Sequence, residues 1–394
     1  MVAPSVNPRL LPPGRFALTN PNGLKRWRLA LADARYSQAV IACCGDSITV
    51  GAYANNVGNG NAAGSYALMR ERGAIGQLRS LFADRYGDVG EGFIRAGEDV
   101  FAGDAARWSL SGGASLQTSS SVGSFKQSYL VNGTSQIVTL ATPACTELRI
   151  VAWWSDGGTA AFEYRVDGGS WTAHSAQSGS DTFFAVTAGT GLANTTHTLD
   201  IRGGSGNGRI VGAVCATNVT TGVAVHRVGY SGTVLKDFTS LFDADDTNGQ
   251  RSLKSATTAL GADLVILWFS ANNVTAGWTT YGLTVAQVAT GFARVIDRAI
   301  ALGMCVLCVV GPDRNPSSYS TTNGGPPGTQ AEYDAAIKAV CAARTHAACL
   351  DIRRVWGSYA TGSADGLYQD TLVHPNRSGH GDIGRLIFDA IGGA

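Results

Sequence analysis

The chain has 394 residues, of which 44% are apolar and only 15% are charged, with a formal net charge of +1. A chain of this length is expected to form about two domains, and its apolar content is enough for a large buried core. The near-neutral charge excludes a strongly basic surface for nucleic acid or an anionic membrane, and no apolar run reaches the ~18 residues that a membrane helix needs.

Residues 1–22 form a tail rich in proline and asparagine. They lack the basic-then-apolar pattern of a signal peptide. We therefore expect either a leader that has been removed or an export route that needs none. A phage virion protein would have the same kind of N-terminus, and an extracellular or virion-associated location is favoured.

Residues 23–106 open with elements typical of an α/β fold. Apolar residues three and four apart, among them Trp27 and Leu31, predict a first helix. Residues 39–44 form an apolar run with the length of a buried strand in a parallel sheet, and the run ends at Gly45-Asp46-Ser47. Residues 68–86 then predict one amphipathic helix.

Residues 107–227 have a different character, because they are rich in serine, threonine and glycine. Short alternating segments and turn signals such as Asp167-Gly168-Gly169 predict strands joined by tight turns. We expect an inserted β-sandwich of the jelly-roll type. Its predicted strands are residues 136–140, 148–154, 161–166, 182–186, 197–201 and 209–214.

Residues 228–394 return to an alternation of strands and helices. The strands are predicted at residues 264–269, 304–310 and 348–352, and the helices at residues 285–302, 330–344 and 378–391. Such an alternation predicts a mainly parallel sheet with helices on both faces. Residues 23–106 and 228–394 are therefore expected to form one discontinuous α/β domain, which the insert interrupts.

The eight cysteines do not predict a metal site. Cys305 and Cys308 have a metal-like spacing, but residues three apart on a strand face opposite sides. No second pair or nearby histidine completes a zinc site, so ordinary buried thiols are expected. Cys341 and Cys349 could form a disulfide if the protein is extracellular, which the sequence does not decide.

Four candidate site residues lie where predicted strands or loops end, namely Ser47, Gly232, Asn272 and His374. In open α/β sheets, reactive groups gather at the carboxyl ends of the strands. A serine becomes a nucleophile when a base takes its proton, and histidine is the common base. A glycine N–H or an asparagine amide can donate to an oxyanion. Taken singly, each residue would also fit an ordinary turn, cap or structural histidine.

Taken together and in this chain order, the four residues resemble the four sequence blocks of the SGNH/GDSL hydrolase superfamily. The resemblance implies a flavodoxin-like, three-layer α/β/α fold and hydrolysis of esters without a metal or other cofactor. It also implies that Ser47 is the nucleophile and His374 its base. The oxyanion hole would consist of the Ser47 and Gly232 N–H groups and the Asn272 amide.

Two blocks depart from the family pattern. The third block normally reads Gly-x-Asn-Asp, whereas this chain has Ser270-Ala271-Asn272-Asn273, which keeps the donor but loses the carboxylate. The last block normally has aspartate three residues before the histidine, but Thr371 stands there and Asp370 lies four before. If the loop bulges by one residue, Asp370 completes a triad. Otherwise a backbone carbonyl orients His374, and the site is a dyad.

The insert bears on the expected substrate, because some glycan-deacetylating members of this superfamily carry a β-sandwich beside or inside the hydrolase domain. Exposed tryptophans stack on sugars, and the insert holds Trp108, Trp153, Trp154 and Trp171, although all four could be core residues. We expect an esterase that acts through an acyl-enzyme on short-chain acyl esters, above all acetyl esters, with an acylated polysaccharide as a candidate substrate.

The sequence leaves two other functions open. The altered third and last blocks would suit a non-catalytic glycan-binding or phage tail protein on the same scaffold. A lipase or thioesterase would use the same machinery on another acyl group. No nucleic-acid or membrane partner is expected for any of the three functions.

Overall fold

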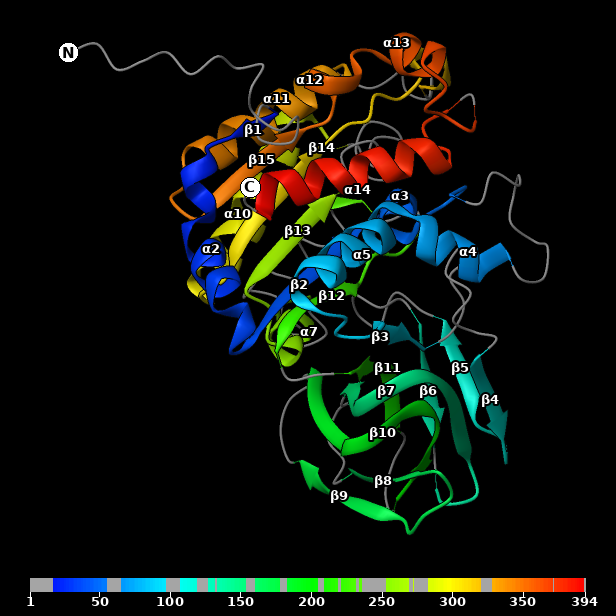
Figure 1. Cartoon of the computed structure of the whole chain (residues 1–394). Coiled ribbons are helices and arrows are strands. Elements are labelled where there is room, and N and C mark those ends of the chain that lie inside the picture. The colour runs from blue at the N-terminus through cyan, green and yellow to red at the C-terminus, as the bar shows by residue number, and fades with distance from the viewer. Residues whose placement is uncertain are drawn as a thin grey trace.

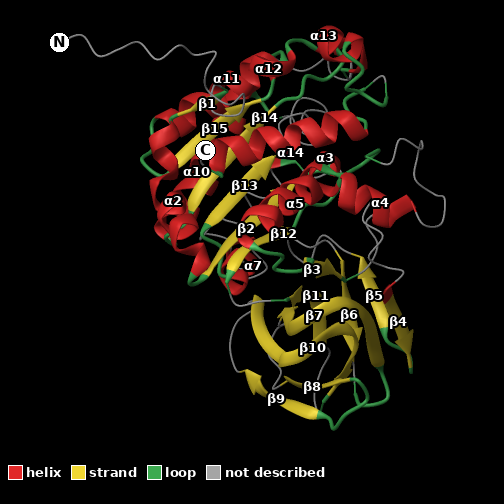
Figure 2. Ribbon diagram, viewed as in Figure 1, coloured by secondary structure: helices red, strands yellow, loops and turns green. Residues whose placement is uncertain are grey.

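The described part of the chain forms two β-sheets of different construction (Figures 1 and 2). The computed structural model describes residues 17–54, 65–96, 107–118, 127–131, 133–153, 160–177, 183–204, 209–218, 221–231, 234–235, 253–268, 272, 283–319, 328–370 and 372–392. Every structural statement below refers to these residues.

The first sheet has six strands and is mixed rather than purely parallel. Its order is β1 (Leu18–Thr19), β15 (Ala347–Asp351), β14 (Cys305–Val310), β13 (Leu264–Trp268), β2 (Gln38–Gly45) and β12 (Gly222–Arg227). Only β1 pairs antiparallel, with β15, and the other neighbours are parallel. The central strands are buried along their length, as expected for apolar runs covered on both faces.

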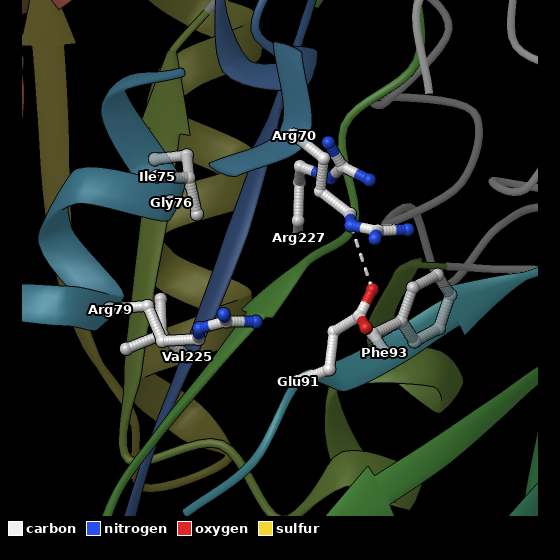
Figure 3. A pocket seen from close by; sticks show the side chains of 8 residues that line it. All are labelled: Arg70, Ile75, Gly76, Arg79, Glu91, Phe93, Val225 and Arg227. Atoms are coloured by element: carbon white, nitrogen blue, oxygen red, sulfur yellow. Dashed lines mark ion pairs between the residues drawn. The ribbon is translucent and has the colours of Figure 1, made fainter. Parts of the chain in front are cut away.

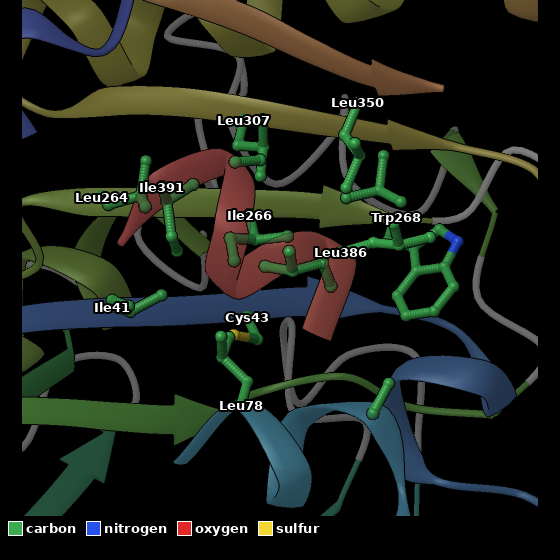
Figure 4. Packing of buried hydrophobic residues seen from close by; sticks show 14 of the residues in the cluster. Ile41, Cys43, Leu78, Leu264, Ile266, Trp268, Leu307, Leu350, Leu386 and Ile391 are labelled. Carbon is green, nitrogen blue, oxygen red and sulfur yellow. The ribbon is translucent and has the colours of Figure 1, made fainter. Parts of the chain in front are cut away.

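Helices cover both faces of this sheet. The described helices are α2 (Lys25–Ala32), α3 (Ser47–Val50), α4 (Ser65–Arg72), α5 (Ala74–Tyr86), α7 (Leu253–Leu260), α10 (Val285–Ala301), α11 (Gln330–Ala342), α12 (Arg353–Trp356), α13 (Tyr359–Ala364) and α14 (Arg377–Ile391), and those that pack on the sheet include α2, α5, α7, α10, α11 and α14. On one face, Leu78 of α5 and Leu386 of α14 pack against Ile266 and other strand residues (Figure 4). On the other face, the core includes Phe292 of α10 and Tyr333 of α11. The mixed sheet and the helices on its two faces therefore form a three-layer α/β structure.

The predicted helix of residues 68–86 is divided into α4 and α5. The break falls at Gly73, where a Cβ would lie 2.7 Å from the Cα of Gly51 and 2.8 Å from the carbonyl oxygen of Met69. The close approach of the chain at Gly51 therefore requires a glycine here, and Gly73 becomes the N-cap of α5.

The second sheet is antiparallel and has nine strands. They are β3 (Gly92–Arg95), β4 (Trp108–Ser111), β5 (Ser115–Thr118), β6 (Gln127–Val131), β7 (Ile137–Trp153), β8 (Ala160–Val166), β9 (Thr172–Gln177), β10 (Phe183–Gly203) and β11 (Arg209–Thr217). The main order is β5-β6-β11-β7-β10-β8-β9, with β3 paired to β11 and β4 to β7. Because hydrogen bonds connect all nine strands into one sheet, the predicted sandwich of two sheets is not confirmed, although the strand-rich region is.

Two strands do not lie where the predicted domain boundaries put them. β12 falls within the predicted insert of residues 107–227, but it pairs parallel to β2, with Val223 opposite Ala39. β3 precedes that insert, but it pairs antiparallel to β11, with Arg95 opposite Ala213. The physical reason for the first difference is packing, because β12 is buried along nearly its whole length, as are the central strands of the mixed sheet. The division into domains itself stays a prediction.

The two sheets share one hydrophobic core. Val151 of β7 and Ala213 of β11 belong to the same buried cluster as Val40 of β2 and Ala224 of β12.

All eight cysteines are buried free thiols, so Cys341 and Cys349 are not joined in this structure. Among the described helices, none combines the length and the apolar character needed to cross a membrane.

Candidate active site

The turn after β2 presents Ser47 at the carboxyl edge of the mixed sheet. Asp46 is the N-cap of α3, and its Oδ1 accepts a hydrogen bond of 3.0 Å from the Ile48 N–H. Gly45 is required before it, because a Cβ there would lie 2.0 Å from Thr49 Oγ1 and 2.3 Å from the Trp268 carbonyl oxygen. The sequence Gly-Asp-Ser thus builds a tight strand-to-helix turn whose first helical residue is Ser47.

His374 reaches this turn from the loop before α14. Its Nε2 lies 2.9 Å from Ser47 Oγ, and its Nδ1 lies 2.5 Å from Asp370 Oδ2. The three predicted residues therefore form one continuous hydrogen-bonded chain. The His374 tautomer with a proton on Nδ1 donates to Asp370 and leaves Nε2 to accept from the serine hydroxyl.

The loop turns tightly around the Asp370 carboxylate. Asp370 Oδ1 accepts from the backbone N–H groups of Leu372, Val373 and His374 at 3.0, 2.8 and 2.9 Å. The turn takes up the additional residue, so a carboxylate four positions before the histidine still reaches its Nδ1. Thr371, which stands where the family normally has the aspartate, lies outside the described residues.

The surroundings of Asp370 keep it ionised. Burial by itself would raise its pKa. Three other effects outweigh burial and lower the pKa to about 2, namely the hydrogen bond from the His374 side chain, the charge of that imidazole, and the backbone N–H groups of His374 and Val373. Asp46, by contrast, is nearly fully buried, and this burial raises its pKa to about 7 against the opposing effect of its backbone hydrogen bonds.

The structure gives less information on the second and third sequence blocks. Gly232 lies outside the described residues. Asn272 is partly buried and lies four residues beyond the end of β13. Because Trp268 at that end pairs with Gly45, both strands finish at the same sheet edge, near the Ser47 turn.

Two further side chains lie beside the triad, and the sequence did not indicate either. The ring of Tyr53 packs against the imidazole of His374, with 4.8 Å between the ring centroids, and its backbone has a φ of 65°. That value is uncommon for a residue other than glycine and is often found at functional sites.

Burial lowers the pKa of the Arg314 guanidinium, whereas the nearby charges of Asp370, Tyr319 and Asp46 raise it.

A buried histidine fixes the segment that carries Tyr53. His380 of α14 accepts a hydrogen bond from the Ala74 N–H on Nδ1, at 3.2 Å, and donates from Nε2 to the Ala52 carbonyl oxygen, at 2.8 Å. Burial, the largest effect, lowers its pKa to about 4. The neutral ring therefore joins α14 and α5 to the chain that follows α3.

A small pocket lies next to this region, between α4, α5 and the edge strand β12 (Figure 3). It contains none of the predicted catalytic residues and is lined by Arg70, Ile75, Gly76, Arg79, Glu91, Phe93, Val225 and Arg227. Glu91 forms ion pairs with Arg70 and Arg107, at 2.9 and 2.7 Å. Within the described residues, no cluster of histidine, cysteine, aspartate or glutamate has the arrangement of a metal site.

Comparisons with solved structures show which known proteins have a similar fold. The structure of a peptidoglycan O-acetylesterase aligns over 95% of this chain and 98% of that one, with a TM-score of 0.65 and 16% identity. A family two carbohydrate esterase from Cellvibrio japonicus aligns over 76% of this chain and 98% of its own, with 10% identity and a TM-score of only 0.29. The first similarity shows a shared fold, and the second is too low to support an argument.

Comparisons of sequence give the family. No curated protein matches the chain. The model of the GDSL-like lipase/acylhydrolase family matches residues 186–381, a range that includes Gly232, Asn272 and His374 and begins after Ser47. This match agrees with the α/β fold and with the order of the sequence blocks, so the chain belongs to the SGNH/GDSL hydrolases and is a carboxylic ester hydrolase.

Proposed function

We propose that this hydrolase is a serine esterase that removes short acyl groups, above all acetyl, through an acyl-enzyme. The observation that carries the proposal is the hydrogen-bonded chain from Ser47 Oγ through His374 to Asp370, with distances of 2.9 and 2.5 Å. A nucleophile, a base within reach of its proton and an acceptor that orients the base are the parts that acyl transfer needs.

In the proposed acylation step, Ser47 Oγ attacks the ester carbonyl carbon while His374 Nε2 takes the hydroxyl proton. The tetrahedral intermediate collapses, the carbon–oxygen bond to the alcohol breaks, and the alcohol leaves with the proton from His374. Water then attacks the acyl-enzyme with His374 again as the base, which releases the carboxylic acid and restores Ser47. Asp370 orients the imidazole and stabilises its protonated form in both steps.

The proposed oxyanion hole consists of the N–H groups of Ser47 and Gly232 and the side-chain amide of Asn272. Ser47 is the first residue of α3, so its N–H has no acceptor within that helix. Removing one donor of such a hole typically costs ~3–4 kcal/mol of transition-state stabilisation. Asn272→Ala would therefore lower kcat more than it changes KM.

An acetylated glycan is the substrate class that we propose. The proposal is supported by the peptidoglycan O-acetylesterase that shares the fold over nearly the whole chain. The tryptophans add little support, because Trp108 is buried and the ring of Trp171 already lies under the guanidinium groups of Arg165 and Arg202. The side chains of Trp153 and Trp154 lie outside the described residues.

Hydrolysis of p-nitrophenyl esters from acetyl to decanoyl tests the reaction. We expect the wild-type chain to prefer the acetyl ester and Ser47→Ala to lose turnover while keeping its circular dichroism spectrum. Ser80→Ala, at an exposed serine of α5, is the matched control and should retain full activity. Turnover by a folded Ser47→Ala variant would refute the assignment, and a preference for decanoyl would indicate a lipase.

Release of acetate from O-acetylated peptidoglycan and from acetylated xylan tests the substrate class. We expect Ser47-dependent release from at least one of these polymers. An enzyme that cleaves p-nitrophenyl acetate but neither polymer would contradict the glycan proposal and leave the esterase proposal intact. A folded wild-type chain without any ester hydrolysis would favour a binding protein on the same scaffold.

A further inference from the structure

Arg95 is a buried cation that contacts the loop after β12. Its side chain comes from β3 of the antiparallel sheet, and the residue is 2% exposed. Its Nη2 donates to the carbonyl oxygens of Val228, at 2.9 Å, and Gly229. The guanidinium also lies over the ring of Tyr230, 5.1 Å from the ring centroid. Arg95 therefore contacts three consecutive residues of one loop.

The same loop is bonded to the turn that carries Ser47. The Val228 N–H donates to the Cys43 carbonyl oxygen at 2.8 Å, and the Tyr230 N–H donates to the Gly45 carbonyl oxygen at 2.9 Å. Gly229 fits closely between them, because a Cβ there would lie 2.9 Å from Thr49 Cγ2 and 3.1 Å from the Gly45 carbonyl oxygen. A shift of residues 228–230 would thus move the end of β2 and the first turn of α3.

The antiparallel sheet holds Arg95 in place. Arg95 pairs with Ala213 of β11, and its carbonyl oxygen accepts a hydrogen bond of 2.8 Å from Trp108 Nε1. Figure 3 shows how β3 approaches the mixed sheet, with Phe93 and Glu91 near Val225 and Arg227 of β12. The contacts of Arg95 therefore connect the antiparallel sheet, the loop and the Ser47 turn in one continuous path.

A guanidinium suits this position for a physical reason. A buried charge is tolerated only when its hydrogen-bonding capacity is used, and the flat fork of arginine can donate to two adjacent carbonyls while one face stacks on an aromatic ring. Lysine keeps the charge but offers a compact ammonium that cannot make the same set of contacts. The contacts therefore depend on the shape of the arginine as well as on its charge.

We propose that Arg95 is a positioning residue for the esterase reaction, because it holds residues 228–230 and, through them, the backbone around Gly45 and Ser47. The inference rests on the proposed function, since it assigns Arg95 to the geometry of the Ser47 nucleophile. It also gives the antiparallel sheet a role in hydrolysis that is independent of any glycan binding.

Arg95→Lys in the full-length chain tests the inference with p-nitrophenyl acetate. Misplacement of reacting groups by about 1 Å can cost ~100-fold in rate, so we expect kcat to fall by roughly 10- to 100-fold. KM should change little, because the small ester makes few contacts that the variant alters. The rate at which a fluorophosphonate labels Ser47 should fall by a similar factor, which reports on the nucleophile without turnover.

Arg202→Lys is the matched control. Arg202 lies in β10 of the same sheet, pairs with Glu163 and stacks on Trp171. A general loosening of the sheet would affect both variants, whereas positioning of Ser47 concerns only Arg95. Wild-type kcat and labelling in a folded Arg95→Lys variant would overturn the inference, as would an equal loss in Arg202→Lys.

A milder variant covers the case in which Arg95→Lys does not fold. Trp108→Phe removes the hydrogen bond to the Arg95 carbonyl oxygen but keeps the guanidinium, so we expect a smaller fall in kcat, measured well below the unfolding temperature. An unchanged kcat in this variant would then overturn the inference. An inactive wild-type chain would refute the proposed function together with this inference, whereas an active chain with unaffected variants would refute only the inference.

Discussion

Asp370 illustrates how local hydrogen bonding decides a question that residue spacing leaves open. The three backbone N–H groups on Oδ1 close the turn, and Oδ2 remains for His374 Nδ1. Asp370→Asn should disturb the bond to His374 Nδ1, since the amide oxygen can still accept from the three backbone N–H groups and the NH₂ donor then faces the imidazole. In the best-studied Ser-His-Asp triad the equivalent change lowers kcat by ~10⁴, because it favours the wrong histidine tautomer.

We therefore expect a severe loss of kcat in Asp370→Asn, measured with p-nitrophenyl acetate. Asp365→Asn, at an exposed aspartate at the end of α13, is the control and should be nearly silent. If Asp370→Asn were as active as wild type while His374→Ala remained inactive, the enzyme would work as a dyad. The role of Asp370 would then be confined to folding of the loop.

The lowered pKa of Asp370 also predicts how stability depends on pH. The carboxyl titrates at 3.8 when free and at about 2 in the folded chain, so the folded state favours the ionised form. Its contribution to stability is complete above pH ~4 and is lost as the pH falls towards ~2. The difference in unfolding free energy between wild type and Asp370→Asn should therefore shrink over this range. A constant difference would contradict the assignment.

At the scale of residues, the sequence singled out Ser47, His374 and Asp370 because each follows a recognisable block or chemical requirement, and the structure joins the three by hydrogen bonds, while their catalytic roles stay predictions. Tyr53 and Arg314 could not be found in the same way. Their position beside the triad depends on the left-handed backbone at Tyr53 and on the path of the loop after β14, neither of which produces a sequence pattern. Gly232 and Asn272 stay predictions as oxyanion donors.

At the scale of elements, His380 joins three segments through two hydrogen bonds. The histidine titrates at 6.5 when free and at about 4 in the folded chain, so folding favours the neutral ring. Its contribution to stability is complete above pH ~6.5 and is lost as the pH falls towards ~4, because the unfolded chain then binds the additional proton.

His380→Gln tests this linkage. Glutamine can accept from the Ala74 N–H and donate to the Ala52 carbonyl oxygen, but it does not titrate. We expect wild type to lose more unfolding free energy than the variant between pH 6.5 and 4, as measured by urea denaturation. Parallel pH profiles for the two proteins would show that His380 does not carry this pH dependence.

The elements that the sequence predicted well are those with strong local signals. The predicted helices at residues 285–302 and 330–344 correspond to α10 and α11, and both begin at a threonine that forms a capping box with Gln287 or Glu332. The lengths of β7 and β10 were underestimated. β-Bulges, such as that between Thr187 and Gly189, let the pairing of β10 with β7 continue through breaks in the alternation of side chains.

At the scale of the whole molecule, the sequence predicted two α/β segments around a strand-rich insert but could not show how closely the two sheets pack. The alternation of residues along β3 and β12 does not reveal which sheet each strand joins. That choice depends on long-range packing, which places Phe93 of β3 and Ala224 of β12 in the same buried cluster. The strand pairing at both ends of residues 107–227 therefore crosses the predicted boundaries, and the division into domains stays a prediction.

This shared core leads to a prediction for unfolding of the full-length chain. Val151 and Ala213 of the antiparallel sheet are buried together with Val40 and Ala224 of the mixed sheet, so unfolding of either sheet would expose apolar surface of the other. Exposure of apolar surface costs ~25 cal/mol per Å², which couples the two transitions when the shared area is large. We expect one calorimetric transition and similar protection from hydrogen exchange for the amides of β7 and β13. Two separate transitions, with β7 exchanging long before β13, would show instead that the antiparallel sheet is an independent unit. Arg95 would then lose its contacts with Ala213 and Trp108 before the hydrolase core unfolds.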